Sequence, residues 1–139
     1  MKRLTALAMV LALSVGAGCS KAEPPLLEAW AQPQIKVLYE NASLAQAISL
    51  THSALDTTAR LPRAVVTLKN TSPNALYVNY QVEWRDGYGA PQSVTPAKHT
   101  SIIPSNCEKT IASYASFRHA KMVVLTVTSA SPAKVFIPY

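Results

Sequence analysis

Leu76-Tyr77-Val78-Asn79-Tyr80-Gln81-Val82-Glu83-Trp84-Arg85 is the stretch of sequence that decides the fold. Apolar or aromatic residues at its even-numbered positions alternate with mostly polar residues at the odd-numbered ones. This period of two predicts a β-strand with one face in a core and the other face in water. The tetrapeptide that follows, Asp86-Gly87-Tyr88-Gly89, is typical of a turn.

Shorter β-prone runs lie on both sides of this strand. Residues 64–68 are rich in valine and lead to Asn70-Thr71-Ser72-Pro73-Asn74, a dense turn signal. The same criteria predict further strands at residues 35–39, 101–103, 107–112, 122–128 and 135–137. Residues 45–50 fit an edge strand or a helical turn; we expect the strand, followed by a polar loop over residues 51–61.

The count is about seven short strands with turn signals between them and no convincing helix, which is typical of a β-sandwich. We therefore predict an all-β fold, a small antiparallel β-sandwich of immunoglobulin-like topology. Trp84 on the strongest strand suits such a core, although the paired cysteines of antibody domains are absent.

The first residues of the chain have the pattern of a bacterial lipoprotein signal. Lys2 and Arg3 precede an apolar run over residues 4–15, which has the length of a signal peptide core and is too short to span a bilayer. Gly16-Ala17-Gly18-Cys19 then resembles a lipobox, with glycine at the position where leucine or valine is usual. We expect cleavage after residue 18 and lipidation of Cys19; an ordinary secretory signal is the alternative.

The next residues indicate a cellular location and a tether. Ser20 and Lys21 follow the cysteine without an aspartate, which by the lipoprotein sorting rule favours the outer membrane over the inner one. Residues 19–34 carry Pro24, Pro25 and Pro33 and are predicted to be a semi-rigid tether. The apolar Leu26, Leu27 and Trp30 either dock on the domain or lie at a membrane surface or a partner. The domain prediction is thus signal peptide 1–18, lipidated tether 19–34 and β-sandwich 35–139.

Charge argues against nucleic acid as a partner. The chain holds 13 Lys and Arg against 7 Asp and Glu, and loss of Lys2 and Arg3 with the signal leaves 11 basic side chains. These are scattered singly, whereas nucleic-acid binding calls for a clustered basic face.

Lipidation of Cys19 would leave Cys107 as a lone thiol, so that no disulfide can form within the chain. We expect Cys107 to be a half-buried small residue on a strand rather than a reactive thiol. Intermolecular pairing through Cys107 stays open.

No catalytic or metal-binding constellation is recognisable. His52, His99 and His119 share no metal-ligand spacing, and a Gly-x-Ser-x-Gly elbow is absent. Asp86 sits where a turn needs a carboxylate to cap backbone N–H groups. We therefore predict no catalytic residues, no metal and no cofactor.

The water-facing side of the strong strand is the predicted binding surface. It combines an aromatic side chain with hydrogen-bonding groups, and Tyr and Arg are enriched at interface hot spots. Glu83 lies on the same face. The predicted binding residues are Tyr77, Asn79, Gln81, Arg85 and Tyr88.

The stretch from residue 66 to residue 127 resembles the YcfL-like family of small Gram-negative lipoproteins. The resemblance rests on the order of Leu68-Lys69-Asn70-Thr71-Ser72, of residues 78–86 followed by Gly89, of Ile103-Pro104, and of Ala115-Ser116-Phe117 with Ala120. It implies a β-sandwich at the outer membrane. Because genes of that family often neighbour one for a lipoprotein activator of a peptidoglycan synthase, it also implies a link to envelope assembly; it carries no catalytic residues.

Together these features predict a non-enzymatic outer-membrane lipoprotein, facing the periplasm, whose sandwich binds another envelope protein. Two alternatives remain: a structural lipoprotein of a secretion apparatus, and a ligand-binding or enzymatic lipoprotein whose pocket the sequence does not reveal.

Overall fold

The computed structural model describes residues 25–32, 35–91 and 95–131. These residues form eight strands and one short helix. Their bounds are β1 Leu27–Gln32, β2 Ile35–Tyr39, α1 Ala42–Ala47, β3 Ile48–Asp56, β4 Arg63–Asn70, β5 Leu76–Asp86, β6 His99–Ile103, β7 Glu108–Tyr114 and β8 Ala120–Ser129.

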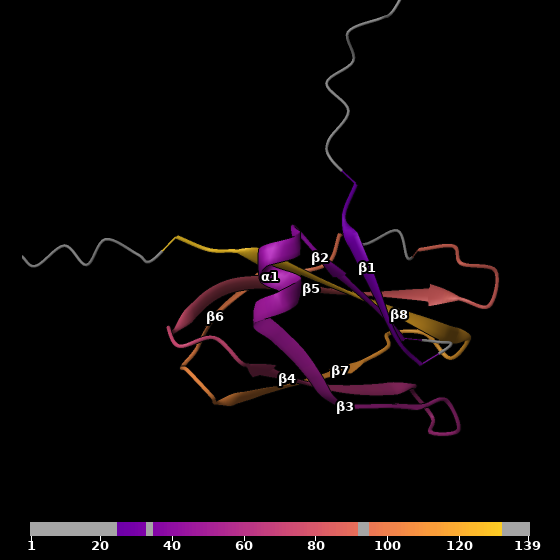
Figure 1. The fold of residues 1–139 in the computed structure, drawn as a ribbon. Coiled ribbons are helices and arrows are strands. Elements are labelled where there is room, and N and C mark those ends of the chain that lie inside the picture. Colours follow the sequence, from indigo (N-terminus) through magenta and orange to yellow (C-terminus); the bar gives the residue numbers. More distant parts are fainter. Residues whose placement is uncertain (1–24, 33–34, 92–94, 132–139) are drawn as a thin grey trace, which may run out of the picture.

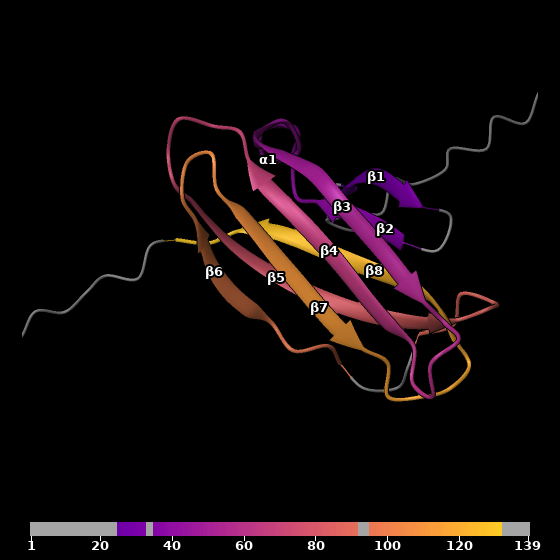
Figure 2. The ribbon, with the colours of Figure 1, turned by 90° about the horizontal axis from the view of Figure 1, so that it is seen from below.

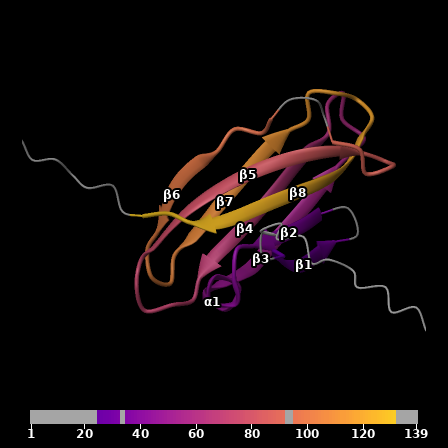
Figure 3. The same cartoon turned by 90° about the horizontal axis from the view of Figure 1, so that it is seen from above.

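The strands make two sheets that pack face to face, so the predicted all-β sandwich is confirmed (Figure 1). One sheet has five strands in the order β1-β2-β8-β5-β6, and the other has three in the order β3-β4-β7. In the view onto the three-stranded sheet, β7 forms one edge of that sheet, and β6, an edge strand of the five-stranded sheet, lies on the same side of the molecule (Figure 2). The long strands β5 and β8 run through the middle of the five-stranded sheet (Figure 3).

One pairing departs from the predicted antiparallel pattern. β2 lies parallel to β8, with Val37 opposite Leu125, whereas the other strand pairs of the described residues are antiparallel. The pair is closed at one end by Glu40, whose backbone N–H donates to the carbonyl of Val127 and whose carboxylate accepts from the N–H of Ser129. A strand near the start of the domain is thereby held against its last described strand.

The core lies between the sheets and follows the period-two patterns of the sequence. On β5, Val78 and Trp84 are buried and Tyr80 and Val82 are half-buried, as the alternation predicts. The opposite sheet contributes Val66, Leu68 and Ile111, among others. The Trp84 indole Nε1–H donates to the hydroxyl of Ser113 at 2.9 Å, which links β5 of one sheet to β7 of the other.

The segment from residue 42 to residue 61 differs from the prediction. Within the segment 45–50, the helical alternative is correct for residues 45–47, which end α1, and the expected edge strand is correct for residues 48–50, which begin β3. The Asn41 side chain caps α1 by accepting from the N–H of Leu44 at 2.9 Å. β3 then runs from Ile48 to Asp56, so the polar loop predicted from residue 51 is wrong over residues 51–56. Polar residues are tolerated there because β3 is an edge strand with one face in water.

The amino-terminal boundary also differs. Residues 27–32 of the predicted tether form β1, which pairs with β2. The predicted signal peptide, Cys19 and the strand at residues 135–137 lie outside the described residues. In the part of the chain that is described, no helix has the length and hydrophobicity needed to cross a bilayer.

Candidate binding surface

The outer face of β5 carries four of the five predicted binding residues. Tyr77, Asn79, Gln81 and Arg85 alternate with the core-facing Val78 and Trp84 and are exposed or half-buried. They share this face because successive side chains of a strand point to opposite sides of the sheet. The sequence pattern therefore correctly predicts that these four side chains lie on the outer face of the sheet.

β6 extends this face at one end. Tyr77 pairs with Ile102, which is 54% exposed, and Asn79 pairs with Thr100. The Thr100 hydroxyl donates to the Asn79 Oδ1 at 2.7 Å. An exposed apolar pair thus lies next to a hydrogen-bonded polar pair, and we call these four residues the Tyr77 patch.

Ile102 and Thr100 are not among the predicted binding residues. The sequence pattern limits this strand to residues 101–103, whereas β6 begins at His99. The sequence of a single strand does not show which residues of another strand lie opposite it. Ile102 and Thr100 are therefore identified as neighbours of Tyr77 and Asn79 only from the register of β5 and β6.

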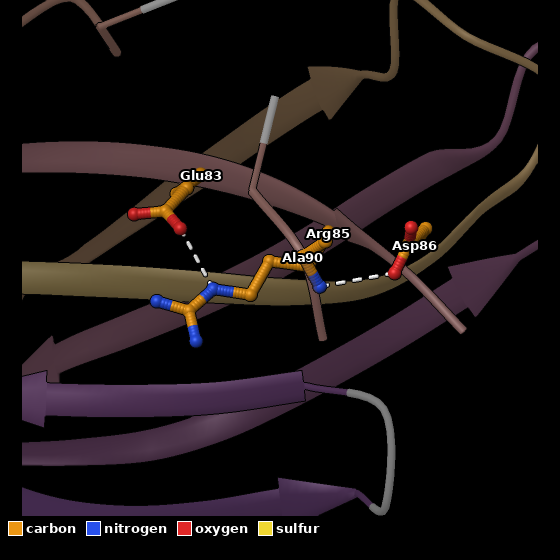
Figure 4. Close-up of polar contacts among 4 residues, drawn as sticks. All are labelled: Glu83, Arg85, Asp86 and Ala90. Carbon is orange, nitrogen blue, oxygen red and sulfur yellow. Dashed lines mark hydrogen bonds and ion pairs between the residues drawn. The ribbon is translucent and has the colours of Figure 1, made fainter. Parts of the chain in front are cut away.

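The middle of the face is occupied by local polar contacts. The Gln81 Nε2–H donates to the carbonyl of Pro96 at 3.3 Å, which holds the segment before β6 against β5. The Arg85 Nε lies 2.7 Å from the Glu83 Oε1, an ion pair between neighbours on one strand (Figure 4). A pair this exposed contributes about 0–1 kcal/mol to stability, so both side chains remain available to a partner.

Tyr88 lies apart from the Tyr77 patch. It is fully exposed at the tip of the turn beyond β5, and the length of β5 separates it from Tyr77, about 30 Å at the rise of a strand. The Asp86 carboxylate accepts from the N–H groups of Tyr88 and Ala90 at 2.9 and 3.0 Å, so its predicted capping role is confirmed (Figure 4). Gly89 turns the chain with a φ of 82°, in the region that favours glycine.

A cleft of about 350 Å³ opens between the edges of the two sheets. Its lining comes from β5, β6, β7 and the residue Ala97: Tyr80, Val82, Ala97, His99, Thr110, Ile111, Ala112 and Ser113. The rings of Tyr80 and His99 stack with centroids 5.2 Å apart. None of the described residues that line the cleft carries a carboxylate or a thiol, and the lining offers hydroxyl groups, one imidazole and aliphatic surface.

The remaining residues considered for chemistry do not converge on a metal site. Among the described residues, no group of three or more His, Cys, Asp or Glu side chains is placed to hold a metal ion. The prediction that Cys107 is half-buried on a strand is wrong, since this residue is exposed in the turn before β7. The turn takes Cys107 off the strand because Asn106 adopts a positive φ of 59°.

The fold and surface define a class of protein: a small mixed β-sandwich with a polar and aromatic outer face. The family model described as "Protein of unknown function (DUF1425)" matches residues 35–129, and the chain belongs to this family. No curated protein matches the chain.

Two solved structures share the fold. The Campylobacter jejuni protein cj0090 has a TM-score of 0.57 and 20% sequence identity, over 71% of this chain and 100% of the other. A DUF1425 family member from Shewanella sp. pv-4 has a TM-score of 0.54 and 13% identity, over 80% of this chain and 94% of the other. At these identities the similarity establishes the fold alone.

Proposed function

We propose that this chain is a non-enzymatic lipoprotein of the YcfL-like type, anchored to the outer membrane through Cys19 and facing the periplasm. Its sandwich binds another envelope protein, in a process linked to envelope or peptidoglycan assembly. The amino-terminal sequence supports the anchor, because a charged start, a short apolar run and a lipobox-like Gly16-Ala17-Gly18-Cys19 come in the required order.

The observation that carries the binding role is the Tyr77 patch. Tyr77 and Ile102 are both exposed, at 37% and 54%, and they are direct cross-strand neighbours. The Asn79 and Thr100 pair beside them supplies a polar rim. An apolar centre beside hydrogen-bonding groups is the usual anatomy of a protein interface.

Ligand binding is the second candidate, and the cleft beside His99 favours it. Its hydroxyl groups and its stacked Tyr80 and His99 rings suit a neutral polar ligand with an apolar part. A protein interface on the Tyr77 patch and a ligand in this cleft involve opposite faces of β5, so variants can separate them.

The binding role is tested by crosslinking in living cells and purification of the full chain. We compare the wild type with Tyr77→Ala/Ile102→Ala and with Leu61→Ala, which removes a similarly exposed apolar side chain between β3 and β4. Capture of one envelope protein that is lost in the double variant and kept in Leu61→Ala supports the proposal. Capture that persists in the double variant assigns the interface elsewhere.

The anchor is tested separately with a radiolabelled fatty acid. The wild type is expected to incorporate label and to sediment with outer membranes, whereas Cys19→Ser is expected to do neither. Labelling of the Cys19→Ser variant would contradict the assignment of the lipidated residue.

A further inference from the structure

The inner face of β6 is not covered by the opposite sheet. In the view onto the three-stranded sheet, β6 lies beside β7 rather than beneath it (Figure 2). Tyr80 and Val82 point toward the core from β5 but are only half-buried, and His99, which pairs with Tyr80, is exposed. The cleft between β6 and β7 is therefore a place where the core lacks a cover.

β7 presents main-chain hydrogen-bonding groups to this cleft. β7 pairs with β4 over seven residues without a register shift, and just before it the carbonyl of Cys107 accepts from the N–H of Asn70. Since alternate residues bond to the same neighbour in an antiparallel ladder, the odd-numbered residues of β7 bond to β4. The N–H and C=O groups of Thr110 and Ala112 therefore point away from β4, toward the cleft.

The side chains of Thr110 and Ala112 do not obstruct this edge. Thr110 lies on the outer face of the sheet, where its hydroxyl is 3.0 Å from that of Thr67. Ala112 is on the same face and is exposed. What these two residues contribute to the lining of the cleft is mainly backbone, in the regular spacing of a strand.

The floor of the cleft is apolar. Val82 and Ile111 line the cleft, and the same two residues also border Val66, Val123 and Leu125 in the core. The cleft has a volume of about 350 Å³, so it can admit an apolar side chain. Burial of such a side chain against Val82 and Ile111 would complete the cover of the core.

Positive charge lies just beyond the lining. Lys109 is half-buried and shares the core-facing side of β7 with Ile111. Its cross-strand partner is Leu68, and no ion pair among the described residues involves it. The neighbouring carboxylate, Glu108, lies on the outer face opposite Lys69. A ligand with an acidic group at this end of the cleft is therefore complementary to Lys109.

We propose that the cleft binds an extended segment of a partner protein, which adds to the open edge of β7 as a fourth strand of the three-stranded sheet. Its neutral main chain pairs with Thr110 and Ala112. One apolar side chain enters between Val82 and Ile111. An acidic side chain two positions away, and so on the same face, approaches Lys109.

An extended peptide suits this edge because its N–H and C=O groups alternate as those of β7 do. In strand addition, main-chain hydrogen bonds supply affinity and pockets for alternate side chains supply specificity. Such a segment is the ligand in the second candidate function, ligand binding in the cleft, on which this inference rests.

The first test measures binding of a dye-labelled probe to the purified full chain in detergent by fluorescence anisotropy. The probe is a short acetylated peptide of threonine with one glutamate and, two positions on, one phenylalanine. The wild type is expected to bind it. Ala97→Trp fills the cleft from an exposed position of its lining and is expected to weaken binding about tenfold or more.

Ala59→Trp is the matched control, because Ala59 is exposed in the turn between β3 and β4, away from the cleft lining. It is expected to bind the probe as the wild type does. A wild-type chain that does not bind the probe, or equal binding by Ala97→Trp, overturns the proposal.

Methylation of single backbone nitrogens of the probe tests strand addition itself. Each methyl group removes one N–H and keeps the side chain. Because successive N–H groups of a strand point to opposite sides, binding is expected to weaken about tenfold at alternate positions and little at those between. The same effect at every position overturns strand addition. If Ala97→Trp still abolishes binding in that case, ligand binding in the cleft stands without it.

Charge reversal tests the assignment of Lys109. Lys109→Glu is expected to weaken binding of the glutamate probe and to favour a probe with lysine in its place. Lys69→Glu changes the same charge on the outer face of the sheet and is expected to keep the preference of the wild type. An unchanged preference in Lys109→Glu overturns the acidic side chain as part of the ligand.

Discussion

Asn70 is a fully buried polar side chain at the end of β4, and both its amide nitrogen and its amide oxygen make hydrogen bonds. Its Nδ2 donates to the carbonyls of Asn74 and Ile103 at 2.7 and 2.8 Å. Its Oδ1 accepts from the N–H and the hydroxyl of Ser72 at 2.9 and 2.7 Å. One side chain thereby shapes the turn after β4 and fastens it to the end of β6.

We expect Asn70→Ala to lower the free energy of unfolding by about 2–4 kcal/mol, because it leaves the buried carbonyl of Ile103 without its donor and Ser72 without its acceptor. Urea denaturation followed by circular dichroism measures the loss. Asn79→Ala is the control, since Asn79 lies at the surface and we expect it to cost about 1 kcal/mol or less. Equal losses in the two variants would show that the Asn70 contacts contribute no more than surface ones.

The sequence marks Asn70 only as part of a turn. Asn, Ser and Pro in succession reveal that the chain reverses, but the bond to Ile103 joins residues 33 positions apart. Burial of Asn70 depends on where β6 ends, which no local pattern encodes. The prediction for Cys107 fails for the same reason, because its exposure depends on the positive φ of Asn106.

Among the elements, β5 is the easiest to predict and β3 the hardest. β5 has one face in the core and one in water along its length, so the alternation of its residues reports its conformation directly. β3 is an edge strand rich in Ser, Thr and His, with a bulge between Leu50 and His52 that interrupts the period. Pairing with β4 stabilises β3 over residues 51–56, although the pattern of β3 itself predicts a strand only as far as Leu50.

The junction of β2 and β8 should make the domain sensitive to acid. The N–H of Ser129 donates to the Glu40 carboxylate and lowers the pKa of Glu40 below its ordinary value. A carboxyl group whose pKa is lowered by folding stabilises the fold above its unfolded pKa, about 4.3 for glutamate, and this contribution fades as the pH falls through the lowered pKa.

The melting temperature is therefore expected to fall less between pH 7 and pH 3 in Glu40→Gln than in the wild type. Glu108→Gln is the control and is expected to keep the wild-type difference. An unchanged pH dependence in Glu40→Gln would contradict a role for this carboxylate at the junction.

At the scale of the whole molecule, the two sheets are joined through polar as well as apolar contacts. Trp84 is buried, and its indole N–H reaches Ser113 across the core. Ser113→Ala leaves this donor without its partner, and we expect it to lower the free energy of unfolding by about 1–3 kcal/mol. In a Trp84→Phe background the same change is expected to cost much less. Urea denaturation measures the loss. Equal losses from Ser113→Ala in the wild type and in Trp84→Phe would contradict a stabilising contact between Trp84 and Ser113.

Part of the candidate surface can be predicted from the local sequence pattern, and part of it depends on strand pairing. Alternation along β5 correctly predicts that Tyr77, Asn79, Gln81 and Arg85 share one outer face. It does not predict Ile102, because that side chain joins Tyr77 through strand pairing. It also groups Tyr88 with Tyr77, although a strand of eleven residues lies between them. Fold class and face are therefore readable from local pattern, whereas the extent of a patch is not.

The parallel pairing of β2 with β8 sets the order in which a growing chain can finish its fold. Ile35 and Val123 are direct partners, although 88 positions separate them along the chain. A chain synthesised from its amino terminus can pair β2 with β1, but it holds β2 without its second partner, β8, until nearly the whole domain has been made. Contacts between such distant segments form slowly. The sandwich accordingly cannot close until most of the domain has been synthesised.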